Sequence, residues 1–233
     1  MYTFKSRVRF SECDSEGRLT VIGLINYLQD CCTMQAEDLD IGISYLKEQD
    51  LGWFLTNWDI CIKEMPFIGE EIYVSTWPYK FAGFIGSRNF KVENAQGSLL
   101  AYADSLWVLM NLKKQAPNRL PELMKERYTT DPALETNDMK RKLQPTGSDK
   151  VVLEFKVDKM YLDTNFHMNN SYYVQGAMEA AGAKKFREII VEYKKSAQYQ
   201  DYVKCVVGDI DGGTHVDMIS DVGDIYAIVQ FKN

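Results

Sequence analysis

The residues best suited to chemistry lie close together in the second half of the chain. Asp163, Asn165 and His167 alternate with other residues just before an apolar stretch. Alternate side chains of an extended segment project to the same side, so this spacing would group a carboxylate, an amide and an imidazole. An imidazole or a carboxylate could activate water, and an amide could orient that water or polarise a carbonyl group. The pattern therefore predicts a hydrolytic site.

A helix is expected to begin near Asn170, directly after these residues. The first turn of a helix offers unbonded backbone N–H groups and a partial positive charge, which suit a developing oxyanion. A structural interpretation competes with this one, because Asp and Asn are common in turns and caps and a single histidine can be a hydrogen-bond partner. Spacing alone leaves both interpretations open.

The segments around this run predict a sheet wrapped around a helix. The helix expected at 170–186 is apolar or small nearly all round, which is typical of a buried helix. Aromatic and β-branched residues, separated by turn signals, predict strands on both sides of it. The expected strands of this half span 150–159, 188–197, 202–208, 214–219 and 225–232.

The first half repeats this order of elements. Thr20 is the expected N-cap of a helix at 21–38, and a short helix is expected near 44–49. The expected strands span 2–10, 52–63, 71–80, 84–92 and 99–112.

The two halves can be aligned without gaps around the turn and the helix. The equivalent pairs are Asp14 with Asp163, Glu16 with Asn165, Arg18 with His167 and Asp30 with Glu179. The first half therefore lacks the amide and the imidazole. Internal duplication predicts an α+β fold with two similar domains, at 1–112 and 150–233, joined by a polar, proline-rich linker at 113–149.

Composition limits the class of protein. The chain has 233 residues, of which 45% are hydrophobic and 26% charged, as in ordinary soluble globular proteins. The net charge of −6 argues against nucleic acid as the main partner, and no apolar run approaches the roughly 20 residues of a membrane helix. The N-terminus lacks an apolar signal-peptide stretch, so a cytoplasmic protein is expected. The five cysteines include no CxxC spacing, so neither a disulfide framework nor a metal site is predicted.

The segment Leu162–Tyr173 resembles the D-x-N-x-H-x-N-N-x-x-Y signature of acyl-ACP thioesterases. Val191–Lys195 is similar to the basic strand that follows the helix in that family, and Arg9–Asp14 is similar to the start of its N-terminal domain. The resemblance covers essentially the whole chain. It implies a tandem double hot-dog fold, in which each antiparallel sheet wraps around a long central helix. It also implies hydrolysis of fatty acyl-[acyl carrier protein] to free fatty acid, without a metal or an organic cofactor.

The resemblance also implies roles for single residues. The family's catalytic residues lie in the second domain and match Asp163, Asn165 and His167, while the first domain is expected to shape the acyl tunnel. Activation of water and attack by the carboxylate both stay open. Plant relatives carry a Glu-Cys pair where this chain has Ser196 and Ala197, so a cysteine nucleophile is absent from the matching place. Ser196 could hydrogen-bond water or substrate, or it could be a structural residue of the strand.

Other residues have two interpretations each. Glu179, on the second helix, could orient a group of the site or lie at the exposed end of the helix. His215 has no partner motif and is expected on the surface or in a strand. Basic residues near the site could contact an acidic carrier and its phosphopantetheine phosphate, or form a solvated face. These residues are Lys184, Lys185, Arg187, Lys194 and Lys195.

Two other functions compete with hydrolysis of acyl-ACP. An acyl-CoA thioesterase would use the same chemistry on another carrier, and a non-catalytic acyl-binding module would bind the thioester without cleaving it. Chain-length preference depends on tunnel depth, which the sequence does not give. The tandem repeat pairs two hot-dog domains within one chain, so a monomer and a homodimer are both compatible with it.

Overall fold

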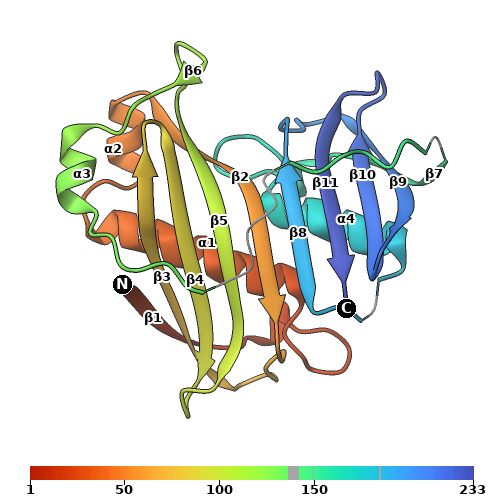
Figure 1. The fold of residues 1–233 in the computed structure, drawn as a ribbon, viewed down its shortest axis with the longest axis horizontal. Helices are drawn as coiled ribbons and strands as arrows, with labels where there is room; N and C mark the ends of the chain where they lie inside the picture. Colours follow the sequence, from red (N-terminus) through yellow and green to blue (C-terminus); the bar gives the residue numbers. More distant parts are fainter. Residues whose placement is uncertain (136–141, 149, 184) are drawn as a thin grey trace. The chain divides into compact units, whose positions relative to one another are not determined.

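The computed structural model describes residues 1–135, 142–148, 150–183 and 185–233. The chain divides into two compact units, each with an antiparallel sheet and a long helix (Figure 1). Unit 1 comprises Met1–Thr56 and Lys63–Asp138, and unit 2 comprises Asn57–Ile62 and Met139–Asn233. Strand β2 (Leu51–Ile62) contributes residues to both units. Within the described residues, no helix is long and apolar enough to cross a membrane.

Unit 1 is built on a sheet and the helix α1 (Val21–Asp38). Its strand order is β1 (Tyr2–Arg7), β3 (Glu71–Ala82), β4 (Ile85–Asn94), β5 (Leu99–Asn111) and β2. The helix packs against β1 and β3 and buries Leu24, Ile25 and Leu28. The Thr20 hydroxyl accepts a hydrogen bond from the Gly23 amide at 3.1 Å, which confirms the expected N-cap.

The segment after β5 packs on unit 1 instead of forming a free linker. Strand β6 (Ala116–Pro117) pairs with β5, and helix α3 (Glu122–Arg127) follows it. Met124 and Tyr128 are buried in a cluster that the short helix α2 (Ile43–Glu48) borders. The buried partners in this cluster are Ala36, Ile41, Leu51, Leu109 and Leu120.

Unit 2 has the same arrangement around helix α4 (Asn170–Ala181). Its strand order is β8 (Glu188–Tyr193), β11 (Ile225–Lys232), β10 (Gly213–Ile219), β9 (Tyr202–Ile210) and β7 (Val151–Lys156). The last residues of β2 pair with β8. Gly176 brings α4 close to the sheet, because a Cβ at this position would lie 2.9 Å from the Phe155 ring. The small residues of α4 thus allow the close approach that a buried central helix needs.

Two elements of unit 2 end earlier than expected. Helix α4 stops at Ala181 instead of residue 186, because Gly182 adopts a left-handed conformation (φ 59°) that ends the helix. Strand β8 stops at Tyr193 instead of residue 197. The amides of Lys194 and Lys195 both donate to the carbonyl of Tyr226, at 2.8 and 3.2 Å, so regular strand pairing ends there.

Residues 142–148 cross the sheet of unit 2 on the face opposite α4 (Figure 1). Leu143 packs against Ile190 of β8 and Ile228 of β11, and its amide donates to the Glu192 carboxylate at 2.8 Å. Three residues on, Thr146 binds β10. We call residues 142–148 the strap. The described parts of the interval 113–149 therefore pack on one unit or the other, although the composition of the interval is typical of a linker.

Equivalent hydrogen bonds recur in the two units. The Leu19 amide donates to the Pro66 carbonyl and the Met168 amide to the Ala197 carbonyl, each at 2.9 Å. Leu19 and Met168 are equivalent in the alignment of the two halves, and the carbonyls of Pro66 and Ala197 accept the bond at the matching place in each unit. Each unit is thus one hot-dog domain, an antiparallel sheet on a long helix, and the expected α+β tandem fold is confirmed.

Candidate active site

The candidate site is a tight turn between the short helix η2 (Lys159–Tyr161) and α4. The Asp163 amide donates to the His167 carbonyl at 2.8 Å, and the Phe166 amide donates to the Asp163 carbonyl at 3.1 Å. Oδ1 of Asp163 accepts from the amides of Asn165, at 2.8 Å, and His167, at 3.2 Å. The structure therefore brings the three predicted residues into one closed turn.

A second segment of unit 2 holds this turn in place. His167 forms an antiparallel bridge with Gln198, and the Met168 amide donates to the carbonyl of Ala197. The amide of Ala197 in turn donates to the Tyr173 hydroxyl at 2.7 Å. Ser196 precedes Ala197 in this loop and is half-buried, so it is not the strand residue that the sequence suggested.

Two tyrosines fix the start of α4. Tyr173 is buried and lies edge-on to Tyr193, with ring centroids 5.6 Å apart. The Tyr193 hydroxyl donates to the Asn170 carbonyl at 2.9 Å. Burial raises the pKa of the Tyr173 phenol well above its ordinary value, so its hydroxyl keeps its proton at neutral pH. The support of the turn is therefore uncharged and insensitive to pH in the neutral range.

The N-terminal amides of α4 are used by the helix cap. Oδ1 of Asn169 accepts from the Ser171 amide at 3.0 Å and from the Ser171 hydroxyl at 3.1 Å. The Tyr172 amide donates to the Asn169 carbonyl at 3.0 Å. These two amides of the first turn are therefore not available to an oxyanion. The capping residue itself competes for them.

The side chain of Asn165 is the better donor for an oxyanion. It is exposed, and within the described residues its carboxamide forms no hydrogen bond. All bonds of the Asp163 carboxylate to described residues go through Oδ1, which serves the turn. His167 is half-buried beside them. An open amide and a partly shielded imidazole on one turn can polarise a carbonyl group and activate water.

Glu179 and the predicted carrier-binding residues show no contact with this turn among the described residues. Glu179 is exposed on α4, so the solvated position, one of its two interpretations, fits it. Lys185 and Arg187 are exposed. Lys194 and Lys195 are exposed but form ion pairs with Glu192, at 3.3 Å, and Asp224, at 2.6 Å. Lys184 lies outside the described residues.

His215 lies in a strand, which is one of its two expected positions, but its burial and its hydrogen bonds were not predicted. It lies in β10 with only 2% of its surface exposed, and its Nε2 donates to Oδ1 of Asp217 at 2.7 Å. Nδ1 accepts from the Gln230 amide at 3.0 Å. Oδ2 of Asp217 accepts from the amide of Thr146, at 2.7 Å, and from its hydroxyl, at 2.9 Å. These contacts tie the strap to the sheet. Sequence reasoning missed them because Thr146 is 71 residues away.

The pKa of Asp217 reflects this network. Burial alone would raise it, but the hydrogen bonds from His215 and Thr146 outweigh burial and hold the pKa below its ordinary value. The carboxylate is therefore ionised at neutral pH, and the strap is held by a charge-assisted hydrogen bond.

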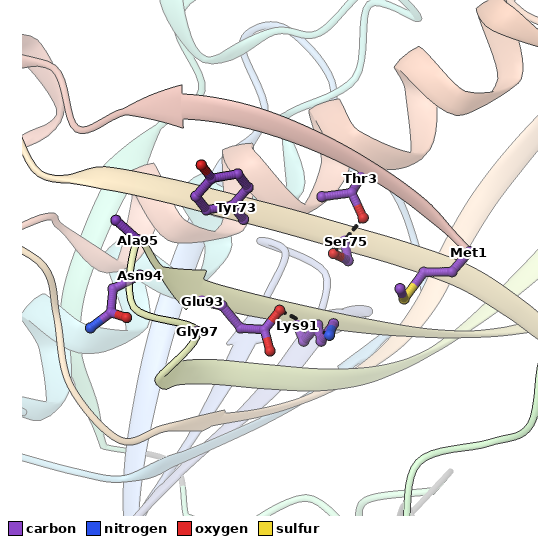
Figure 2. Close-up of a pocket in the computed structure, with 9 residues that line it drawn as sticks. All are labelled: Met1, Thr3, Tyr73, Ser75, Lys91, Glu93, Asn94, Ala95 and Gly97. Carbon is purple, nitrogen blue, oxygen red and sulfur yellow. Dashed lines mark hydrogen bonds and ion pairs between the residues drawn. The ribbon is translucent and has the colours of Figure 1, made fainter.

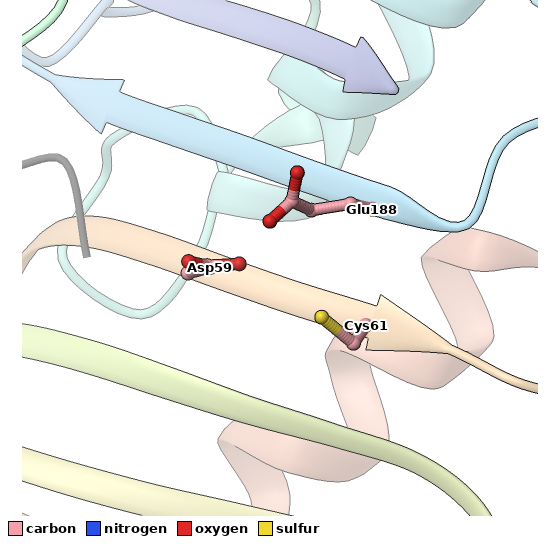
Figure 3. A group of neighbouring side chains, drawn as sticks. All are labelled: Asp59, Cys61 and Glu188. Carbon is pink, nitrogen blue, oxygen red and sulfur yellow. The ribbon is translucent and has the colours of Figure 1, made fainter. Parts of the chain in front are cut away.

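A group of possible metal ligands lies elsewhere in unit 2. Figure 3 shows Asp59, Cys61 and Glu188, whose ligand atoms lie within 4.8 Å of one another. Glu188 accepts a hydrogen bond from the Lys232 ammonium at 2.8 Å, which neutralises one of the two carboxylates. An ion pair therefore accounts for part of this group. Its members come from β2 and β8, so no short sequence motif could reveal it.

A hollow in unit 1 shares no residue with the candidate site (Figure 2). Its polar groups bind one another: the hydroxyls of Thr3 and Ser75 are 2.7 Å apart, and Lys91 pairs with Glu93 at 2.8 Å. Because these groups are satisfied internally, the hollow offers little to a polar ligand.

Comparisons with known families identify the chain. Residues 1–128 match the acyl-ACP thioesterase N-terminal domain, and residues 145–230 match the acyl-ACP thioesterase C-terminal domain. The two matches together cover most of the chain, so this protein belongs to the acyl-ACP thioesterase family. The resemblance of the chain to this family is thereby confirmed.

Plant proteins are among the relatives. The chloroplastic acyl-[acyl-carrier-protein] hydrolase FATB1 of Cuphea viscosissima is 23% identical over 218 residues, which cover 85% of this chain and 52% of the plant protein. The chloroplastic oleoyl-acyl carrier protein thioesterase 2 of Arabidopsis thaliana is 23% identical, covering 87% of this chain and 61% of its own length. The chain thus spans about half the length of the plant relatives.

Solved structures share the fold over the whole chain. An acyl-ACP thioesterase from Bacteroides thetaiotaomicron superposes with a TM-score of 0.89 at 23% identity, covering 99% of this chain and 96% of the other. The 12:0-ACP thioesterase from Umbellularia californica superposes with a TM-score of 0.86 at 17% identity, with the same coverage of both chains. At these identities the likeness establishes the tandem hot-dog fold.

Proposed function

We propose that this protein hydrolyses the thioester of fatty acyl-[acyl carrier protein], releasing the free fatty acid and the carrier thiol and so ending chain elongation. The observation that carries the proposal is the closed turn of Asp163, Asn165 and His167 in a member of the acyl-ACP thioesterase family. An amide open to solvent and a half-buried imidazole stand on one rigid turn.

His167 acts as the general base in this proposal. It takes a proton from a water molecule as the water oxygen attacks the thioester carbonyl carbon. The tetrahedral intermediate then collapses, the carbon–sulfur bond breaks, and the imidazolium returns its proton to the leaving sulfur. The products are a carboxylic acid and a thiol, so all atoms and protons are accounted for. No metal and no organic cofactor takes part.

Asn165 and Asp163 have different tasks. The Asn165 carboxamide donates to the carbonyl oxygen as its negative charge develops. Oδ1 of Asp163 accepts hydrogen bonds from the backbone amides of Asn165 and His167 and so fixes the backbone of both residues. These bonds give Asp163 a task in building the turn, and the proposal therefore assigns water activation to His167. Ser196, in the loop beside the turn, is a supporting residue.

Unit 1 supplies the acyl specificity in this proposal. Its turn lacks the amide and the imidazole, while its interior is rich in large apolar side chains that could contact an acyl chain. Acyl carrier protein is the proposed partner, and Lys185 and Arg187 stay proposed contacts of its phosphate. A homodimer and a cytoplasmic location also stay predictions.

Release of free thiol from a panel of acyl carrier proteins and matching acyl-CoAs tests the reaction. We expect faster release from the carrier protein, and its loss in His167→Ala. The matched control is Arg18→Ala, at the equivalent position of unit 1, which should keep its activity. A clear preference for acyl-CoA would mean that the protein is an acyl-CoA thioesterase and not an acyl-ACP thioesterase in function. If no thiol is released from either carrier, the protein is not a thioesterase and an acyl-binding role becomes the better account.

A further inference from the structure

Phe166 combines two unfavourable features at one position of the candidate site. Its backbone is left-handed (φ 62°), and its side chain is 78% exposed. A left-handed backbone is unfavourable for a bulky L-residue. Exposure of a phenyl ring to water is unfavourable as well. The equivalent residue of unit 1 is Gly17 (φ 79°), so the turn itself requires no side chain here. The phenyl ring therefore has a use other than building the turn.

Two more exposed apolar side chains lie on the neighbouring segments. Met160, in η2, is 72% exposed, and Tyr199, in the turn after Gln198, is 44% exposed. The His167–Gln198 bridge sets Phe166 opposite Tyr199 along the chain. We call Met160, Phe166 and Tyr199 the apolar patch. Exposed apolar groups gathered at a site are typical of an interaction surface.

One cation borders the apolar patch, and a second lies on the adjoining strand β7. The Lys159 ammonium lies 5.5 Å from the centroid of the Tyr199 ring, and the Lys156 ammonium lies 5.7 Å from that of Tyr202. Neither ammonium forms an ion pair with any described residue. Two carboxylates nearby in the chain accept backbone bonds and keep their negative charge: Asp158 accepts from the Lys159 amide at 2.6 Å, and Asp201 from the Gln198 amide at 2.8 Å. The surface thus presents two ammonium groups that have no ion pair with a described residue, next to exposed apolar groups.

We infer that the apolar patch, with Lys156 and Lys159, is the docking surface for the acyl carrier protein. This inference rests on the proposed function. The partner must present apolar side chains and carboxylates, as an acidic carrier protein does, and must bring its thioester to Asn165 and His167. Phe166 lies between Asn165 and His167 in the chain. A carrier protein that contacts Phe166 would therefore also lie next to the candidate active site. A transient enzyme–carrier complex needs only a small interface.

The first test measures binding without hydrolysis. Labelled acyl carrier protein, carrying a non-hydrolysable acyl amide on its phosphopantetheine arm, is titrated with the wild-type protein and with variants. Met160→Ser combined with Tyr199→Ser should raise Kd at least tenfold. Val222→Ser is the matched control, because Val222 is an 84% exposed apolar residue in the β10–β11 turn of the same unit. It should leave Kd within twofold. An unchanged Kd in the double variant would overturn the inference.

The second test separates the carrier from the acyl chain. In the double variant, kcat/KM for acyl carrier protein should fall at least tenfold more than kcat/KM for the matching acyl-CoA. Equal losses on both substrates would mean that the patch contacts the acyl or pantetheine group, and would overturn the assignment. So would sedimentation data in which the wild-type protein is a dimer and the double variant a monomer. That result would identify a surface for self-association.

The binding titration also separates this inference from the proposed function. If the wild-type protein binds the carrier through the patch but releases no thiol, hydrolysis fails and the docking surface stands. If it hydrolyses acyl carrier protein while the double variant binds as tightly as wild type, the docking surface fails and hydrolysis stands.

Discussion

The turn at Asp14 in unit 1 and the turn at Asp163 in unit 2 have the same backbone but different side chains. In each, the aspartate amide donates to a carbonyl four residues on, at 2.8 Å. Oδ1 of Asp14 accepts from the amides of Glu16, at 2.9 Å, and Arg18, at 3.0 Å, as Oδ1 of Asp163 does in unit 2. The aspartate is thus a structural residue of both turns, and unit 2 differs in having Asn165 and His167 where unit 1 has Glu16 and Arg18.

Arg18 and His167, which occupy equivalent positions, also differ in their surroundings. The Arg18 guanidinium lies 4.1 Å from the centroid of the Phe67 ring, where its charge stabilises the packing of unit 1. The bridge partner of His167 is Gln198, a polar residue. In unit 1 the side chain at this position packs on an aromatic ring. In unit 2 it is an imidazole, which can accept and donate a proton.

The largest expected effect is on the rate of hydrolysis. His167→Ala removes the proposed general base, so kcat should fall by about 10²- to 10⁴-fold. Arg18→Ala should change kcat less than threefold, although it removes a cation–π contact. Single-turnover thiol release from acyl carrier protein measures both variants. A loss in Arg18→Ala comparable to that in His167→Ala would contradict the division of labour between the two turns.

The aspartates test how much of the site is scaffold. Asp14→Ala and Asp163→Ala each leave two turn amides without an acceptor, so each should lower the free energy of unfolding by about 1–3 kcal/mol. Urea unfolding measures this loss, and activity should fall steeply only in Asp163→Ala.

Asp163→Asn refines the comparison, because the amide oxygen can still accept from both backbone N–H groups. We expect it to keep most of the stability. If it also keeps activity within about tenfold, Asp163 acts through the turn. A loss of activity as deep as that of Asp163→Ala would instead restore the carboxylate as the attacking group.

The units also differ in the side chain that binds the segment lying against the sheet. In unit 1 the Leu134 amide donates to the neutral Asn89 side chain at 2.9 Å, and in unit 2 the Thr146 amide donates to the Asp217 carboxylate at 2.7 Å. Asp217→Asn should therefore lower the free energy of unfolding by about 1–3 kcal/mol at pH 7, the range for bonds to charged groups.

This loss should depend on pH in unit 2 alone. The pKa of Asp217 is lowered in the folded protein, so its stabilisation is present above the unfolded pKa of about 3.9 and is lost as pH falls through the folded value. Urea unfolding from pH 7 to pH 3 should show the wild-type protein and Asp217→Asn converging below about pH 4. Asn89→Ala should lose a constant amount over that range. Parallel curves for wild type and Asp217→Asn would show that the lowered pKa contributes nothing.

Local signals in the sequence predicted most of the fold. The limits of α1, the cap at Thr20 and the recurrence of the Asp turn all depend on residues close together in the chain. The turn that groups the candidate site residues was likewise predicted from one short run, because an Asx turn and a helix cap are local structures. What the sequence did not predict depends on contacts across the fold: the strap on Asp217, the hydrogen bonds of His215 within its strand, and the early end of β8, which Tyr226 brings about.

The smallest expected effect concerns the tip of the turn, where unit 1 has Gly17 and unit 2 has Phe166. Both are left-handed, and a Cβ at Gly17 would meet only ordinary contact with Ile68 at 3.7 Å, so conformation and not space favours glycine there. Gly17→Ala should therefore lower the free energy of unfolding by about 1 kcal/mol, and Phe166→Gly should leave it unchanged or raise it by less than that. Urea unfolding of both variants measures the difference. If Phe166→Gly instead destabilises unit 2 by as much as Gly17→Ala destabilises unit 1, the phenyl ring packs within its own chain. A stable Phe166→Gly that binds the carrier weakly would mean that the strained phenylalanine is retained for recognition, at the position where the turn of unit 1 has no side chain.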